Sequence, residues 1–541
     1  MEMIRSPYSA RYKENYIISN PIKETLASTG KERILEYASK HFVEDGKAML
    51  ILCQGRSTAN KTAEKIGSWI DHQSLPLNDD MVIIQKYLEE EIGCPTLFSQ
   101  LLNKRIAVHH AGLSDETKLL IEHLIRERQI QYVCATTTVA EGVNFPVSSV
   151  YFDSYYRGAA RPENIMTSND FWNIAGRAGR TMVDDFGKIV LPFNSSQNEA
   201  IAKGIVSKSA EELVSVLSIM FDDRQNIMDV LNNSENPIIQ LTNKYEDSFG
   251  PLFQYFIHLL QMSNNENAQD VEDLFKDTYI YSRLSAEDQA EFIRLCRMIY
   301  KKIEAKYASN SGPMAFADKT GFSVPSVLKI MAEQSKKPSI SDKESWSPEA
   351  LFNPDNVANL TEKIGVVAAL RETNLGTDSK AAPFNPEIVA QMLISWVNGD
   401  KLNSISTIHP YFNDNDTTQR VTNFVSYMNG ARFKASWGLS ALEGIARGVD
   451  DEVHDSFVPS FVYYGVNEKK SLALRMIGIP RSLSSSLSKI IENDVASYSF
   501  QKLRKTVAEL PLRDWDSYIP VNSKLSGAEW KRITEILIKE K

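Results

Sequence analysis

The sequence is short of several features that define whole classes of protein. It holds only 4 cysteines in 541 residues, and these lie far apart without metal-ligand spacing. This scarcity excludes a disulfide scaffold and favours a reduced, intracellular setting. No apolar run approaches the length of a membrane span, and the first residues lack the apolar core of a signal peptide. We therefore expect a cytoplasmic or nucleoid-associated protein that is neither secreted nor bound in a membrane.

Positive charge is also scarce, with 60 Lys and Arg against 69 Asp and Glu and a formal net charge of -9. This balance argues against a protein coated in basic charge, although a narrow basic channel can lie within such a total. The segment 466–541 differs, because it holds 14 Lys and Arg against 9 Asp and Glu.

The pattern of apolar residues changes near residue 193. Before it, short apolar segments alternate with helical patterns, which predicts a parallel sheet covered by helices on both faces. The predicted strands lie at 48–53, 105–110, 131–137, 149–153 and 187–193. After it, apolar residues recur at spacings of three and four, which is typical of helices.

A polar stretch at 334–346 is predicted to be a loop or linker that divides the helical half. The regions expected are a leading segment or interdomain linker at 1–44, an α/β domain at 45–196, and helical regions at 197–345 and 346–541.

Hydroxyl groups and glycine follow the third predicted strand. Thr136, Thr137 and Thr138 stand at its end, and Gly142 allows close approach of the backbone. Ligands bind beyond the carboxyl ends of parallel strands, and hydroxyls with open backbone N–H groups suit phosphate oxygens. Threonines near strand ends are also common in proteins without such a site, so this pattern alone leaves both readings open.

The segment 173–180 reads NIAGRAGR, which places two arginines behind glycines. A spacing of three puts Arg177 and Arg180 on one side of a helical turn, and the glycines remove side-chain bulk between them. This arrangement favours an anionic ligand. The alternative is a surface pair bonded to a nearby carboxylate, Asp184 or Asp185.

Four segments in order resemble the motifs of a known family. ILCQGRSTANKTAEKI, VHHAGLSDETK, ATTTVAEGVNFP and NIAGRAGR, all within 51–180, resemble motifs IV, IVa, V and VI of superfamily two helicases. The forms HHAGL, GVNFP and GRAGR are most similar to the Ski2-like DExH-box branch. One departure is Asn173, because motif VI of that family usually opens with glutamine.

The resemblance implies the second of two RecA-like domains, with ATP and Mg held in the cleft between the two. It implies that Arg177 and Arg180 reach the phosphates as catalytic groups. It also implies nucleotide-binding roles for Gly142, Asn144, Asn173 and Gly176. Nucleic-acid-binding roles are implied for Gln54, Arg56, His110, Thr136 and Thr138. For His110 a packing role is an alternative, and we expect no metal at His109 and His110, since adjacent strand residues point to opposite faces.

The parts that hold ATP in such a motor are missing from the sequence. There is no GxxxxGK[ST] phosphate cradle, and neither STGKE at 28–32 nor DEVH at 451–454 supplies one or the acidic pair for magnesium. We therefore expect a helicase or translocase that works only with a first RecA-like domain, on a partner chain or another segment, and is inactive alone. The alternative is a non-catalytic module that binds nucleic acid or a partner.

The helical half contains two patterns that fit a grip on single-stranded DNA or RNA. In 316–331, Ala317, Gly321 and Val327 have the offsets of a helix-turn-helix, with Ser323 placed to cap the second helix; the resemblance implies a winged-helix module here. At 477–480 a hairpin flanked by Arg475, Arg481 and Lys489 could meet phosphate through its backbone, or be a solvated corner.

Overall fold

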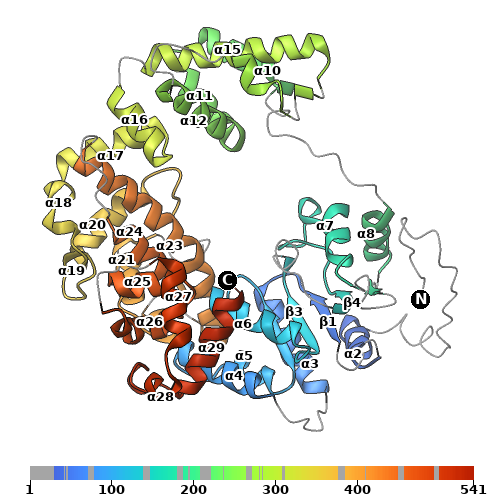
Figure 1. The fold of residues 1–541 in the computed structure, drawn as a ribbon. Helices are drawn as coiled ribbons and strands as arrows, with labels where there is room; N and C mark the ends of the chain where they lie inside the picture. The colour runs from blue at the N-terminus through green and yellow to red at the C-terminus, as the bar shows by residue number, and fades with distance from the viewer. Residues whose placement is uncertain are drawn as a thin grey trace.

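A computed structural model gives the fold of this chain (Figure 1). The structure describes residues 30–41, 43, 47–70, 78–137, 147–178, 187–192, 195–207, 221–235, 237–262, 271–278, 281–282, 284–307, 311–375, 384–408, 410–412, 414–448, 456–492 and 499–540.

Five strands form one sheet in the first part of the chain. They are β1 (Ala48–Leu52), β2 (Ile106–His109), β3 (Tyr132–Ala135), β4 (Val147–Phe152) and β5 (Lys188–Val190), in the spatial order β2-β3-β1-β4-β5. All neighbouring pairs are parallel. Every residue of β1 to β4 is buried, which explains why these strands are continuous apolar runs and could be located in the sequence. The five predicted strands are confirmed.

Helices cover both faces of the sheet, as predicted. The connection through α3 (Arg56–Trp69) moves from β1 past β3 to β2, whereas α6 (Asp115–Arg126) connects β2 back to β3. Because parallel crossovers are right-handed, connections that run in opposite directions place their helices on opposite faces. The other helices of this region are α2 (Lys31–His41), α4 (Asp79–Ile92), α5 (Leu97–Leu102), η2 (Pro162–Asn164) and α7 (Ser168–Ala175).

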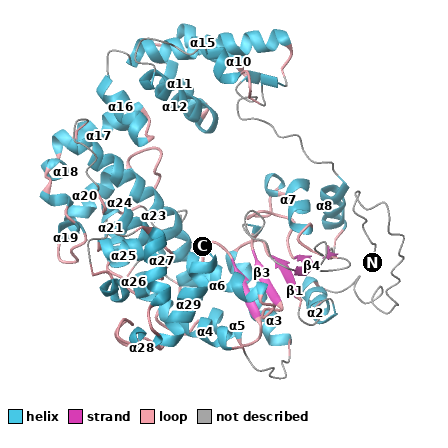
Figure 2. Cartoon of the chain, in the orientation of Figure 1, coloured by secondary structure: helices cyan, strands magenta, loops and turns pink. Residues whose placement is uncertain are grey.

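Helices make up the described secondary structure after β5, as predicted (Figure 2). They are α8 (Ser196–Ser207), α10 (Arg224–Asn233), α11 (Pro237–Lys244), α12 (Glu246–Met262), α13 (Val271–Phe275), α15 (Ala286–Tyr307), α16 (Ser311–Thr320), α17 (Val324–Lys336), α18 (Pro338–Ser341), η3 (Glu344–Trp346), α19 (Pro348–Leu351), α20 (Val357–Ala368), α21 (Pro386–Val397), α22 (Leu402–Thr407), η4 (Pro410–Phe412), α23 (Thr417–Arg447), α24 (Val458–Tyr464), α25 (Lys469–Met476), α26 (Arg481–Leu487), η5 (Ser488–Ile490), α27 (Phe500–Glu509), α28 (Leu512–Trp515) and α29 (Gly527–Glu540).

The prediction of a loop or linker at 334–346 is wrong. This stretch continues α17 and then forms α18 and η3. Trp346 is buried, and its Nε1 donates to the carbonyl of Ile340 at 2.8 Å. The polar side chains misled because they bond within the fold: Ser345 Oγ accepts from Lys363 Nζ of α20 at 3.1 Å. The domain boundary after residue 345 stays a prediction.

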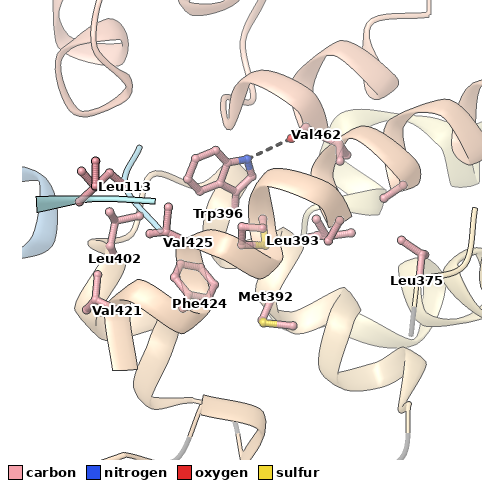
Figure 3. Packing of buried hydrophobic residues seen from close by; sticks show 14 of the residues in the cluster. Leu113, Leu375, Met392, Leu393, Trp396, Leu402, Val421, Phe424, Val425 and Val462 are labelled. Atoms are coloured by element: carbon pink, nitrogen blue, oxygen red, sulfur yellow. Dashed lines mark hydrogen bonds between the residues drawn. The ribbon is translucent and has the colours of Figure 1, made fainter. Parts of the chain in front are cut away.

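The helix α23, 31 residues long, organises the C-terminal core. It approaches α20 so closely that a Cβ at Gly438 would lie 2.3 Å from Val367 Cγ1. Figure 3 shows Val425 of α23 in one cluster with Trp396 of α21 and with Leu113, which belongs to the loop after β2. The C-terminal helices and the sheet region therefore share a continuous hydrophobic core.

Candidate nucleotide and nucleic-acid site

The candidate nucleic-acid residues gather at one edge of the sheet. Ala135 is aligned with both Leu52 and His109, so β1, β2 and β3 end side by side. Gln54 and Arg56 follow β1, and Thr136 follows β3. Parallel strands deliver such residues to a common carboxyl edge, where ligands bind.

Gln54 is held in place at this edge. Its Nε2 donates to the carbonyl of Gly158 at 2.5 Å, which joins the end of β1 to the loop after β4. Gly158 has a φ of 80°, a left-handed conformation that favours glycine.

His110 has a packing role in this structure. It is 1% exposed, and its ring bridges Asn60 Oδ1, 2.9 Å from Nε2, and the backbone N–H of Gly112, 3.2 Å from Nδ1. Burial lowers the pKa of His110 to about 3, so the ring is neutral, with Nδ1 accepting and Nε2–H donating. Both ring nitrogens are thus used inside the protein, which favours the packing alternative over a contact with nucleic acid.

His109 bonds in a different direction, with its Nε2 2.9 Å from Glu122 Oε1 of α6, while His110 bonds to Asn60 of α3. The two rings therefore serve opposite faces of the sheet. Within the described residues there is no cluster of three His, Cys, Asp or Glu side chains suited to a metal ion.

The described candidate nucleotide residues lie at the end of α7 and on the turn that follows it. The helix ends at Ala175, and the N–H groups of Arg177 and Ala178 donate three residues back, to Ile174 at 3.1 Å and Ala175 at 3.0 Å. Arg177 therefore stands on a tight turn beyond the helix rather than within it. Arg180 lies outside the described residues, so the shared face of the two arginines stays a prediction.

Local sequence fixes the start of α7. Thr167 caps the helix by accepting from the N–H of Asp170 at 3.2 Å, and Asp170 Oδ2 accepts in return from the N–H of Thr167 at 3.2 Å. Phe171 packs against Phe152 of β4 with ring centroids 5.0 Å apart. Asn173 is exposed near the end of this anchored helix.

Gly176 is also exposed and ends α7 with a φ of -65°, a conformation open to any residue. A Cβ at Gly176 would lie 3.0 Å from the carbonyl oxygen of Trp172. That oxygen belongs to the last turn of α7 and already accepts from the N–H of Gly176 at 2.9 Å, so no described element other than α7 itself lies against this position.

The two groups of candidates lie at opposite edges of the sheet. Ala178 forms a parallel bridge with Val147, which is the first residue of β4 and is aligned with Ala48, the first residue of β1. Arg177 is therefore near the amino edge, whereas Thr136 is at the carboxyl edge. Thr138, Gly142 and Asn144 belong to the segment between β3 and β4 and lie outside the described residues.

The helix-turn-helix pattern corresponds to a real pair of helices. α16 and α17 are joined through Gly321, which has a φ of 75°. Ser323 occupies the capping position, but its side chain makes no capping bond and its Oγ donates to Ser326 Oγ at 3.2 Å. Leu328 and Met331 are exposed on α17. Recognition of nucleic acid by this pair stays a prediction.

The hairpin at 477–480 is buried. The predictions that it contacts phosphate or forms a solvated corner are therefore both wrong. Arg475 forms an ion pair with Glu116 of α6 and donates to the carbonyl of Ile479 at 2.7 Å. Arg481 donates to the carbonyls of Trp396 at 3.0 Å and Asp400 at 2.6 Å. These cations hold the hairpin inside the protein, a use that hairpin sequence alone does not reveal.

Sequence reasoning also missed the position of α23 over the loop that follows β2. Asn429 Nδ2 donates to the carbonyl of Ala111 at 3.0 Å, and Thr422 packs on Gly112. One turn beyond Asn429, Phe433 is 58% exposed. The sequence indicates a long helix in this region, but nothing in it places that helix at the sheet.

Among the described helices, none combines the length and the hydrophobicity needed to cross a membrane.

The known proteins that this chain resembles are Ski2-like helicases, and the relationship covers about a third of the chain. The Hachiman protein HamB of Bacillus cereus is 28% identical over 211 residues, which are 35% of this chain and 18% of HamB. The ATP-dependent DNA helicase Hel308 of Thermoplasma volcanium is 28% identical over 178 residues, 33% of this chain and 25% of Hel308. The antiviral helicase SKI2 of Saccharomyces cerevisiae is 29% identical over 181 residues, 31% of this chain and 14% of SKI2.

Each match spans a quarter or less of the relative's own length. No protein-family model matches the chain. The resemblance to Ski2-like helicases inferred from the four motifs is confirmed.

Proposed function

We propose that this chain supplies the second RecA-like domain and strand-binding helices of an ATP-dependent helicase or translocase. A first RecA-like domain, on a partner chain or another segment, supplies the phosphate cradle and the magnesium ligands. ATP with Mg then lies between the two domains, with Arg177 and Arg180 directed at its phosphates.

The observation that carries this proposal is the position of the described motif residues at two edges of one sheet. A helicase motor must bind ATP and nucleic acid at separate sites and couple the two sites. Here the candidate nucleic-acid-binding residues stand at the carboxyl edge, and Arg177 stands near the amino edge. In this proposal the segment that carries Thr138, Gly142 and Asn144 links the two places.

The surface beside the carboxyl edge suits a single strand of nucleic acid. Gln54 and Arg56 are half-buried at this edge and are the proposed phosphate contacts, whereas Thr136 is only 8% exposed. The helix α23 extends this edge from its contact at Ala111 to the exposed ring of Phe433. Exposed aromatic rings stack with bases of any sequence, so such a surface accepts DNA or RNA. A winged-helix role for α16 and α17 would add a further contact.

The experiment joins the chain to a first RecA-like domain, by fusion ahead of Met1 or as a separate chain. We expect no ATP hydrolysis by the chain alone, and hydrolysis stimulated by single strands in the joined protein. Arg177→Ala or Arg180→Ala should then lower turnover by roughly a hundredfold or more with strand binding intact, because the arginine acts on charge in the transition state.

Lysine at position 177 should restore little activity, because a point charge cannot reproduce the forked contact of a guanidinium group. Arg294→Ala, at an exposed position on α15, is the matched control and should leave turnover unchanged. Wild-type turnover in the Arg177→Ala protein would instead show that this arginine is structural. Nucleic-acid binding without ATP hydrolysis in the joined protein would support the second candidate, a non-catalytic module that binds nucleic acid or a partner.

A further inference from the structure

One face of the sheet region carries five carboxylates that meet cations from the C-terminal helices. We call Asp80, Glu89, Glu90, Asp115 and Glu116, which lie on α4 and at the start of α6, the acidic face. Each is paired with a base from beyond residue 400. The pairs are Asp80–Arg532 at 2.8 Å, Glu89–Lys524 at 3.1 Å, Glu90–Lys401 at 2.6 Å, Asp115–Arg432 at 2.5 Å and Glu116–Arg475.

Several of these pairs are shielded from water. The side chains of Glu90 and Arg475 are 4% and 6% exposed, and that of Arg432 is 11% exposed. Such pairs are screened far less by salt than pairs on an open surface. Bidentate bonding from Arg532 lowers the pKa of Asp80 against the opposing effect of burial, so this carboxylate is charged at neutral pH.

Apolar contact accompanies the charges. Trp530 of α29 meets Tyr87 of α4 edge to face, with ring centroids 5.9 Å apart. Two ion pairs have the reverse polarity, Lys86–Glu529 at 2.6 Å and Arg126–Glu540. The last helix of the chain thus lies against α4 and α6, which Figure 1 also shows.

The cations have two possible uses, and the contacts distinguish them. The basic surplus of 466–541 suggests binding to nucleic-acid phosphates. However, Arg475, Lys524 and Arg532 are already bonded to the acidic face, and Arg481 is bonded to backbone carbonyls. These four cations act within the molecule.

We propose that the acidic face is a clamp that joins the C-terminal helices to the sheet, so that α23 and the sheet move as one body. Arg432 and Arg475 attach α23 and α25 to the two residues that begin α6, while Arg532 and Lys524 attach α29 and the segment before it to α4. The clamp fixes the spacing between the exposed ring of Phe433 and the carboxyl edge. It stands on contacts within this chain and does not depend on the proposed function.

Charge reversal in the full chain tests the clamp. We expect amides of α29 to exchange hydrogen at least about tenfold faster in Asp80→Arg and in Arg532→Asp, because the clamp opens locally. The double exchange Asp80→Arg with Arg532→Asp should return the rate to within about threefold of the original, since the pair is restored. Glu199→Lys, in an exposed pair with Lys203 on α8, is the matched control and should leave α29 unchanged.

Exchange rates that are equal in all variants, or a double variant no better than either single one, would overturn the clamp. Affinity for single-stranded nucleic acid distinguishes the two uses of the cations. If Arg532→Asp lowers this affinity and the double variant does not recover it, Arg532 binds nucleic acid instead.

Spin labels give a second measurement that does not depend on charge reversal. The labels would be attached to Ser68→Cys on α3 and Ser440→Cys on α23, both at exposed positions. Cys94→Ser would first remove the one cysteine that is partly exposed, since the other three are buried. One body predicts a single narrow distance that is unchanged by added single strands. Two distances, or a shift on adding strand, would show that the parts move separately and contradict the proposal.

Discussion

Gly112 shows how packing alone can require a glycine within a sequence motif. Its φ is not in the left-handed region, so backbone conformation does not demand glycine here. A Cβ at Gly112 would lie 2.5 Å from Thr422 Cγ2 and 2.8 Å from the carbonyl oxygen of Thr422. The motif residue is small because α23 lies directly against it.

Gly112→Ala should therefore lower the free energy of unfolding by about 1–3 kcal/mol, because an added methyl group must displace α23. Gly430→Ala on the same helix is the control. A Cβ at Gly430 meets nothing within 4 Å, and alanine should raise stability by up to about 1 kcal/mol through helix propensity. Urea unfolding measures both, and similar effects from the two changes would contradict this account.

Glu91 is a buried carboxyl group beside the clamp. It accepts hydrogen bonds from Ser114 Oγ at 2.9 Å and Thr117 Oγ1 at 2.7 Å. Burial, with repulsion from Glu116, raises the pKa of Glu91 to about 7. The fold therefore favours its protonated form.

This shift predicts a dependence of stability on pH. The folded pKa lies above the ordinary value of 4.5, so the contribution of Glu91 is fully present below that value and is lost as pH rises through about 7. We expect Glu91→Gln to flatten the fall in Tm between those two values. Glu64→Gln, at an exposed position on α3, should keep the original slope. An unchanged slope in Glu91→Gln would remove Glu91 as its source.

At the scale of elements, Lys363 explains how a polar segment becomes a helical corner. It is fully buried, and its Nζ donates to Asn359 Oδ1 at 2.6 Å, Ser345 Oγ at 3.1 Å and the carbonyl of Ser339 at 3.4 Å. Burial lowers the pKa of Lys363 to about 8. One ammonium group thus ties η3 and α18 to α20.

Lys363→Ala should lower the free energy of unfolding by about 2–4 kcal/mol, because it leaves buried acceptors without a donor and opens a cavity. Hydrogen exchange within 338–346 should rise with it. Lys329→Ala, at an exposed position on α17, should change stability by less than about 0.5 kcal/mol. A small effect at Lys363 would mean that Trp346 packing holds the corner by itself.

The sequence allowed some elements to be predicted and not others, for a physical reason. The strands β1 to β4 are short apolar runs that signal burial on both faces, so local pattern located them. The strand β5 was located by its apolar run as well, although it is only partly buried. The corner at 334–346 and the hairpin at 477–480 depend on partners elsewhere: Arg475 bonds to Glu116, 359 residues away. Local polarity cannot reveal such pairing.

The candidate site was likewise predictable where local sequence determines it, and not where distant residues do. Spacing located the turn of Arg177 and the strand ends that carry Gln54 and Thr136. It could not show that His110 is enclosed, because its partner Asn60 lies on α3, 50 residues earlier in the chain. Nor could it place α23 beside the carboxyl edge.

At the scale of the whole molecule, charge and aromatic contacts make separate contributions to strand binding. The net charge is -9, and four cations of the C-terminal segment act within the fold. Binding of a single strand by the chain alone should therefore be weak and should depend on few phosphates. Affinity should fall as salt rises, since each neutralised phosphate releases counterions.

Two variants should separate these contributions in fluorescence anisotropy at several salt concentrations. Arg56→Ala should reduce the slope of log affinity against log salt by about 0.7, the value for one phosphate of a single strand. Phe433→Ala should weaken binding by roughly 5- to 150-fold at every salt concentration and leave the slope unchanged, because stacking involves no counterions. Phe500→Ala removes a similarly exposed ring on α27, which is not part of the proposed nucleic-acid-binding surface, and should have no effect. If Phe433→Ala and Phe500→Ala behave alike, or if binding does not depend on salt, the strand does not follow α23 and the surface beside the carboxyl edge has another use.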